Sequence, residues 1–348
     1  MSKMLLGPVM IDIAGFSLSA TDRERLLNPL VGGIILFSRN FESQKQLSEL
    51  TTEIHALRNP ELLIAVDHEG GRVQRFKDGF TRLPAMRNLG CLWDKNKASS
   101  IAMAHSLAYI LAAELIVNKV DFSFAPVLDV DHQKSKVVGD RAFHSNPIAI
   151  SELTIAFMRG LHQAGMPAVG KHFPGHGYVE VDSHFGVPVD DRVFTDIERI
   201  DLLPFSEIIK SGLDGIMPAH VIYPNVDKNP AGFSEFWIRQ VLRDQLKFDG
   251  IVFSDDLCME GAKVVGGIRE RAIAALEAGC DMVLVCNDSV QADELLSSLN
   301  FDVIEINSTR LNELRRYKRQ ISDPSFLIND PVYNQALLDL KSLEIIHN

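Results

Sequence analysis

The segment Lys171-His-Phe-Pro-Gly-His-Gly177, followed closely by Asp182-Ser-His184, concentrates ionisable side chains in one stretch of the chain. The imidazole of histidine titrates near neutral pH, so a histidine placed here can both donate and accept a proton. In an extended segment, residues two apart point the same way, so the Asp182 carboxylate can lie against the His184 imidazole and favour its protonated form. Such a pair can protonate a leaving group.

Two other interpretations of these residues stay open. An Asp-x-His pair in a loop can be a solvated turn without a catalytic role. Alternatively, a metal can be bound by histidines and acids, and the candidate ligands are His172, His176, His184, His220, Asp67 and Asp255. The sequence contains no HExxH, and no HxH follows the first expected strand, so we do not expect a metal. We also expect no cofactor.

These side chains need a scaffold, and short runs of aliphatic and β-branched residues recur along the chain. Runs of this length with no polar alternation are typical of parallel strands that are buried on both faces of a sheet. The expected strands are Val9–Ile13, Gly33–Phe37, Leu62–Val66, Phe122–Leu128, Ala168–Phe173, Gly215–Ala219, Gly250–Ser254 and Met282–Cys286.

Segments with helical periodicity separate these runs. The expected helices are Gln44–Leu57, Ser99–Asn118, Ile148–Ala164, Asp196–Ser211, Ser234–Leu246 and Ile268–Ala278. Gly165, Gly212 and Gly279 stand just past helix ends, where a left-handed residue is favoured. About eight strand-helix repeats fit an α/β (β/α)8 TIM barrel better than an open doubly wound sheet, which usually has five or six strands.

We expect residues 1–300 to form the barrel as one catalytic domain, because no Gly/Ser-rich or Pro-rich linker divides them. The strand-helix pattern stops near Leu299, and the last residues have an amphipathic helical pattern. We therefore expect residues 301–348 to form a helical extension packed on the barrel.

In such a barrel, catalytic groups lie at the carboxyl ends of the strands, because only that face gathers side chains from every strand. Polar residues of the sequence fall at these positions. The groups near the expected strand ends are Asp67 and Arg75, Asp129 and Arg141, Lys171 and His172, His220, and Asp255 and Asp256.

Composition excludes several classes of protein. The 348 residues include 35 Lys and Arg but 46 Asp and Glu, and the formal net charge is −11. This charge argues against nucleic acid or an anionic membrane surface as a main partner. We find no run of roughly 20 uncharged apolar residues, so we expect no membrane-spanning helix. The four cysteines form no CxxC pair, and we expect a reducing compartment, the cytoplasm.

Five ordered motifs resemble the β-N-acetylhexosaminidases of glycoside hydrolase family 3, in the branch that recycles bacterial peptidoglycan. The resemblance covers about Leu5 to Asp288, and His68 departs from it where many members have Gln. The motifs are Val66-Asp-His-Glu-Gly-Gly-Arg-Val-Gln-Arg-Phe76, Phe124-Ala-Pro-Val-Leu-Asp129, the segment from Lys171 to His184 given above, Met217-Pro-Ala-His220 and Phe253-Ser-Asp-Asp-Leu-Cys-Met-Glu-Gly261.

The resemblance implies a single-domain enzyme that removes terminal β-linked N-acetylglucosamine with retention of configuration. It implies that Asp255 is the nucleophile and that His184, oriented by Asp182, is the acid and base. It also implies sugar-binding roles for Asp67, Arg75, Arg141, Lys171 and His172. The expected substrates are GlcNAc-containing muropeptides, above all those ending in 1,6-anhydro-N-acetylmuramic acid, and we expect a monomer.

Other functions on the same scaffold remain as alternatives. Phosphate in place of water would make the protein a phosphorylase, because a neutral histidine repels an incoming anion less than a carboxylate does. A sugar-binding protein without turnover is a non-enzymatic alternative, but it would be expected to lack Asp255 or His184, and both are present. A barrel metallohydrolase is the third alternative.

Overall fold

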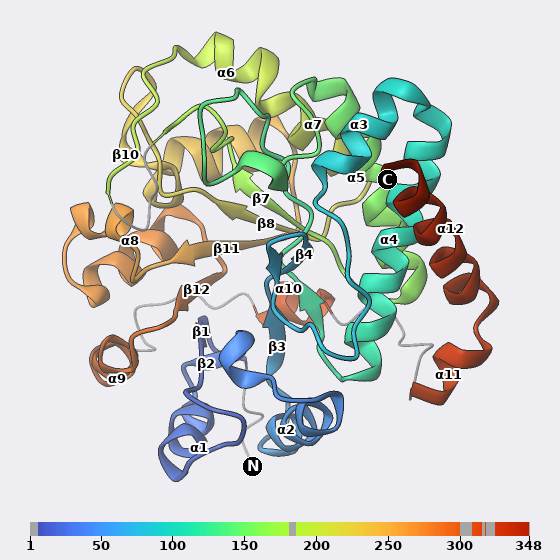
Figure 1. Cartoon of the computed structure of the whole chain (residues 1–348). Helices are drawn as coiled ribbons and strands as arrows, with labels where there is room; N and C mark the ends of the chain where they lie inside the picture. Colours follow the sequence, from blue (N-terminus) through green and yellow to red (C-terminus); the bar gives the residue numbers. More distant parts are fainter. Residues whose placement is uncertain (1–5, 181–185, 300–307, 315–316, 318–323, 348) are drawn as a thin grey trace.

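The computed structural model describes residues 6–180, 186–299, 308–314, 317 and 324–347. A central sheet of eight strands is surrounded by helices (Figure 1). The strands of this sheet are β1 (Val9–Ile11), β2 (Val31–Leu36), β3 (Leu63–Val66), β6 (Phe122–Ser123), β7 (Val169–Phe173), β8 (Gly215–Pro218), β11 (Ile251–Asp256) and β12 (Met282–Val285). Each predicted strand overlaps one of them.

The sheet is parallel and closes on itself. Its strands are paired in the order β6-β3-β2-β1-β12-β11-β8-β7. Two isolated parallel bridges, Ser123 with Ala168 and Val127 with Lys171, then join β6 to β7 at the two ends of this order. An open doubly wound sheet would leave these ends unpaired, so the predicted TIM barrel is confirmed.

Aromatic side chains fill the barrel interior. Phe122 on β6 and Phe253 on β11 have ring centroids 5.4 Å apart, although their strands are far apart in the pairing order. Phe124 packs edge-on against both rings, at 5.2 Å from each. All three side chains are fully buried, so the interior is a packed core that holds the strand ends in fixed relative positions.

The helices lie outside the barrel (Figure 1). The main ones are α1 (Ala20–Leu27), α2 (Gln44–Ala56), α3 (Arg87–Lys95), α4 (Lys97–Val117), α5 (Pro147–Ala164), α6 (Phe194–Ile200), α7 (Leu202–Lys210), the π-helix η4 (Phe236–Gln245), α8 (Ile268–Ala278) and α9 (Ser289–Ser298). Shorter elements are the 3-10 helices η1 (Ser38–Asn40), η2 (Gly139–Arg141), η3 (Ala231–Phe233) and η5 (Glu260–Val265), and the strand pairs β4 (His68–Gly70) with β5 (Val73–Gln74) and β9 (Ile222–Tyr223) with β10 (Asp227–Pro230).

Local sequence explains several helix ends. Helix α5 begins after Asn146, whose side chain accepts from the Ile148 N–H, and it ends at Gly165 in the left-handed conformation. The single helix predicted over 196–211 is instead two helices that meet at Asp201. Pro204 accounts for the break, because its ring would clash with the Ile200 carbonyl in a continuous helix.

Helix α4 corrects one expectation from the sequence. By length and composition, Lys97–Val117 is a helix that could cross a membrane, whereas we expected no such segment. Within the fold, 78% of its apolar window is buried, and α3, α5 and α12 pack against it. A helix covered by protein on several sides is apolar around most of its circumference, which explains its composition.

The C-terminal residues that the structure describes add three helices, α10 (Ser308–Glu313), α11 (Pro324–Asn329) and α12 (Pro331–His347). Helix α12 runs beside α4 (Figure 1). The Ser106 hydroxyl on α4 donates to Asp339 on α12 at 2.8 Å, and the Tyr109 hydroxyl donates to Asp330 at 2.5 Å. The predicted domain boundary at residue 300 lies outside the described residues and stays a prediction.

Candidate active site

A cavity of about 720 Å³ opens at the carboxyl ends of the barrel strands. Its wall includes Asp67 just after β3, His172 in β7 and Asp255 in β11. The predicted site residues that line it are Asp67, Arg75, Arg141, Lys171, His172 and Asp255. Side chains separated by almost 190 positions in the sequence are thus brought to one cavity, whose size suits a small molecule.

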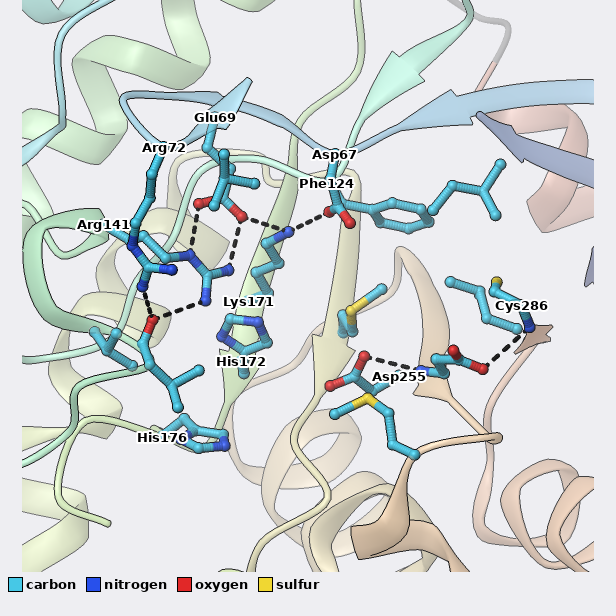
Figure 2. Close-up of a pocket in the computed structure, with 18 of the residues that line it drawn as sticks. Asp67, Glu69, Arg72, Phe124, Arg141, Lys171, His172, His176, Asp255 and Cys286 are labelled. Carbon is cyan, nitrogen blue, oxygen red and sulfur yellow. Dashed lines mark hydrogen bonds and ion pairs between the residues drawn. The ribbon is translucent and has the colours of Figure 1, made fainter. Parts of the chain in front are cut away.

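Lys171 is the centre of a chain of alternating charges on one wall of the cavity (Figure 2). Its Nζ lies 2.6 Å from Asp67 Oδ1 and 2.8 Å from Glu69 Oε1. Arg141 then binds Glu69 at two points, Nη2 to Oε1 at 2.7 Å and Nε to Oε2 at 2.8 Å. Lys171 and Arg141 are each matched by an acid, which suits the wall to a neutral ligand that is rich in hydroxyl groups.

Burial and neighbouring charges act in opposite directions on these groups. Burial raises the pKa of Asp67, but the cations of Lys171 and Arg75 outweigh it and hold the pKa below its ordinary value. Burial likewise raises the pKa of Glu69, and Arg141 and Lys171 reverse the shift and hold it far below the usual range. Burial lowers the pKa of Lys171, and Asp67 and Glu69 raise it above its ordinary value. All three side chains therefore stay charged at neutral pH.

Two glycines shape the hairpin that carries Glu69 and Arg75. Gly70 and Gly71 have φ values of +108° and +55°, in the region that L side chains rarely adopt. A Cβ on Gly70 would lie 2.7 Å from the Pro84 carbonyl oxygen, so the backbone approaches too closely for a side chain. The turn places Glu69 toward Lys171, and it places Arg75 with Nη2 at 3.5 Å from Asp67.

Asp129 fixes the imidazole of His172. The Asp129 Oδ2 atom lies 2.7 Å from Nδ1 of His172, while Oδ1 accepts the backbone N–H groups of His172 and His176. Burial raises the pKa of Asp129, but His172 outweighs it and the pKa is lowered overall. An ionised carboxylate at Nδ1 keeps a proton on that nitrogen and fixes the orientation of the ring, with Nε2 as the other polar atom of the ring.

Asp255 lies across the cavity from Arg141 (Figure 2). Its Oδ1 accepts the backbone N–H of Asp256 at 2.8 Å. Asp256 Oδ1 in turn accepts the N–H groups of Cys258 and Cys286, at 2.9 and 3.1 Å. Burial raises the pKa of Asp256 to about 7, and the Asp255 charge adds to that shift. The strand end thus carries one carboxylate toward the cavity beside a second acid anchored to the backbone.

The remaining predicted residues divide into two groups. Asp182 and His184 lie outside the described residues, so their proposed roles stay predictions. His220 is buried, stacks on Phe233 with a centroid distance of 5.1 Å and meets the Asp256 carbonyl oxygen through Nε2. Among the described residues, no group of three or more His, Cys, Asp or Glu could hold a metal ion.

Sequence reasoning missed two residues of the site. Glu69 belongs to a motif in which the sequence assigns it no role, yet it is the shared partner of Lys171 and Arg141. Asp129 stands at a strand end and in a motif, and the sequence assigns it no role, yet it holds His172. Their position in the sequence could have indicated a role in the site. Each acid follows a barrel strand, and the neighbouring strands are followed by residues that were already assigned to the site.

Comparisons with known proteins give a consistent result. The family model described as "Glycosyl hydrolase family 3 N terminal domain" matches residues 8–315. Proteins named "Beta-hexosaminidase" from Nitrosospira multiformis and Thiobacillus denitrificans are each 58% identical, over 90% and 96% of this chain and 89% and 93% of their own length. The structure of NagZ from Neisseria gonorrhoeae in complex with N-trifluoroacetyl-D-glucosamine superimposes with a TM-score of 0.91, at 45% identity and 99% coverage of both chains.

Proposed function

The chain belongs to glycosyl hydrolase family 3 as a β-N-acetylhexosaminidase, and from this premise we propose that it releases terminal N-acetylglucosamine from peptidoglycan fragments with retention of configuration. The observation that carries the proposal is the position of the Asp255 carboxylate on the wall of a cavity lined by charged hydrogen-bonding groups. A retaining glycosidase needs such a carboxylate beside the anomeric carbon.

In the first step of the proposed mechanism, an Asp255 oxygen attacks the anomeric carbon as the bond to the leaving oxygen breaks. His184 donates its proton to that oxygen, and Asp182 stabilises the imidazolium beforehand. In the second step, neutral His184 removes a proton from water, the water oxygen bonds to the anomeric carbon, and the bond to Asp255 breaks. The two inversions restore the original configuration.

A histidine in place of the usual second carboxyl group suits this cycle. Retaining enzymes ordinarily use two carboxyl groups about 5 Å apart, one as nucleophile and one as acid and base. An imidazole with an ordinary pKa of about 6.5 can act as acid and then as base near neutral pH. From the sequence we expect His184 to lie in a loop, which would let it approach after the sugar has bound.

The charged wall supports a sugar-binding role. The Asp67 carboxylate, held by Lys171 and Arg75, can accept hydrogen bonds from neighbouring hydroxyls of the ring. Arg141 can donate to the acetamido oxygen or a hydroxyl with the donors that Glu69 leaves free, and Nε2 of His172 can form a hydrogen bond with a hydroxyl. The wall would hold the ring so that the anomeric carbon faces Asp255.

The expected substrate is a fragment from peptidoglycan recycling in which GlcNAc is linked to 1,6-anhydro-N-acetylmuramic acid.

We also propose a cytoplasmic location. The four cysteines, all of which are free thiols, agree with a reducing compartment. Burial raises the pKa of Cys258, Cys280 and Cys286, so these thiols stay protonated and unreactive.

Covalent labelling tests the proposal. A 5-fluoro inactivator derived from GlcNAc should attach to Asp255, as read from the mass of the proteolytic peptide around Asp255. The variant D255N should take up no label under the same conditions, and D256N should still be labelled. A label on another residue, or uptake by D255N, would contradict the assignment. The sugar product formed from p-nitrophenyl β-GlcNAc in the presence of phosphate, GlcNAc or GlcNAc 1-phosphate, separates hydrolysis from phosphorolysis.

A further inference from the structure

The position of the Arg75 guanidinium depends more on the backbone that carries it than on the contacts of the side chain. Its guanidinium makes a long hydrogen bond, 3.5 Å from Nη2 to Asp67, and lies 5.7 Å from the Phe37 ring centroid. Its Nε atom is buried and has no hydrogen-bond partner within the part of the chain that the structure describes. Whatever fixes the backbone at residues 73–76 therefore decides where this cation lies in the cavity.

Gln74, the residue before Arg75, fixes that backbone. Its buried side-chain amide donates to the carbonyl oxygens of Phe76 and Thr81, at 3.2 and 2.9 Å, and accepts the Leu83 N–H at 3.0 Å. The last two of these hydrogen bonds join the strand β5 to the returning segment 81–83. The position of Thr81 is thereby transmitted to the backbone that carries Arg75.

Thr81 is held in turn by Glu114, a buried acid on α4. Glu114 accepts the Thr81 N–H at 2.9 Å and the Thr81 hydroxyl at 2.5 Å. Its Oε1 also accepts the Tyr333 hydroxyl of α12 at 2.6 Å. A buried carboxylate needs several donors, and Tyr333 supplies one of them from the C-terminal helix.

We propose that Tyr333 and Glu114 are positioning residues for Arg75, so that the C-terminal helix α12 contributes to sugar binding through Thr81 and Gln74. The inference rests on the proposed sugar-binding role of Arg75. It assigns a function to a helix that the sequence connects to no chemistry and that lies on the outside of the barrel (Figure 1).

Conservative variants with a matched control test the inference. Y333F removes one hydroxyl from the hydrogen-bonded path, and T81A removes another, which T81S restores. S106A removes a hydrogen bond of the same kind between α4 and α12, to Asp339, that does not reach Thr81. On p-nitrophenyl β-GlcNAc, we expect Y333F and T81A to raise KM about 3- to 10-fold with kcat within about twofold, while T81S and S106A stay close to wild type.

A double-mutant cycle separates this inference from the function on which it rests. R75A alone should raise KM, and adding Y333F to R75A should raise it no further, because the path ends at Arg75. Additive effects, or equal effects of Y333F and S106A, would overturn the inference and leave the function intact. If R75A leaves KM unchanged, the sugar-binding role of Arg75 is itself wrong. Thermal melting of each variant checks folding, and T81A with T81S keeps the test decisive if Y333F is unstable.

Discussion

Glu69 and Arg141, 72 residues apart in the sequence, form a two-point ion pair on the wall of the cavity, with N to O distances of 2.7 and 2.8 Å. Glu69 is 3% exposed at its side chain, and the same carboxylate also binds Lys171. One acid thus orients two of the cations proposed to bind the sugar. Because Arg141 and Lys171 surround Glu69, its contribution to the site is to hold these two cations in place.

Replacing Glu69 should therefore damage both stability and activity. E69Q leaves Arg141 and Lys171 buried with one acid fewer, and breaking a buried pair typically costs about 3–5 kcal/mol. We expect a loss of that order in the free energy of unfolding, measured with urea, and a fall in kcat/KM of at least about 100-fold. E49Q removes an exposed acid paired with Lys45 and should cost less than about 1 kcal/mol. Similar losses in both variants would contradict this role for Glu69.

His184 should matter in proportion to the difficulty of the leaving group. H184A removes the proposed proton donor, so a disaccharide substrate should be slowed by about 100-fold or more. An aryl glycoside whose phenolate leaves without protonation should be slowed much less. Steady-state kcat/KM on p-nitrophenyl β-GlcNAc and on a GlcNAc disaccharide gives the comparison. Equal losses on both substrates would show that His184 is not the acid.

Asp256 should make stability fall as the pH rises. Its folded pKa is raised by burial from 3.8 to about 7, so the folded chain binds this proton more tightly than the unfolded chain between those values. The stability that this proton contributes is fully present below about pH 4. It decreases by up to about 1.4 kcal/mol per pH unit as the pH rises, and the loss is complete once the pH has passed about 7. D256N keeps an acceptor oxygen but no charge, so its stability relative to wild type should increase from pH 5 to 8.

Urea denaturation of both proteins at several pH values measures that difference, with D78N as a control because the Asp78 side chain is 89% exposed. Titrations shared by all the variants cancel in the comparison. A difference between D256N and wild type that is constant across this range would show that Asp256 does not retain its proton on folding.

Asp129 should act on activity through His172. D129N replaces the oxygen at Nδ1 of His172 by an amide and removes the charge that fixes the tautomer, so kcat/KM should fall by about 10- to 100-fold. D94N is the matched control, because Asp94 contacts His144 at 3.2 Å in an exposed pair outside the cavity. Steady-state kinetics on p-nitrophenyl β-GlcNAc should separate the two variants, and equal activity would contradict the role of Asp129.

Chelation should leave the reaction unaffected. The proposed steps use a carboxylate, an imidazole and water, so incubation with EDTA followed by assay should leave activity within about twofold of the untreated enzyme. Loss of activity in EDTA that returns with added zinc or manganese would revive the metallohydrolase alternative.

The sequence by itself predicted the barrel and several of the charged residues that line its cavity. Continuous apolar runs predicted strands buried on both faces, and the parallel barrel places every strand end on one side. Asp67, Lys171 and Asp255 could therefore be assigned to one site without knowledge of their distances. The motif residues next to strand ends were sufficient for this assignment, because the order of residues along the chain shows which of them stand at the end of a strand.

Only the tertiary structure decided which side chains hold the others. The pairings of Glu69 with Arg141, Asp129 with His172, and Tyr333 with Glu114 join segments that are 72, 43 and 219 residues apart. No local pattern encodes such contacts, because periodicity and turn residues report only on near neighbours. The break at Asp201 and the burial of α4 likewise depended on packing: the sequence predicted a helix over Ser99–Asn118 but not that the helices α3, α5 and α12 cover it.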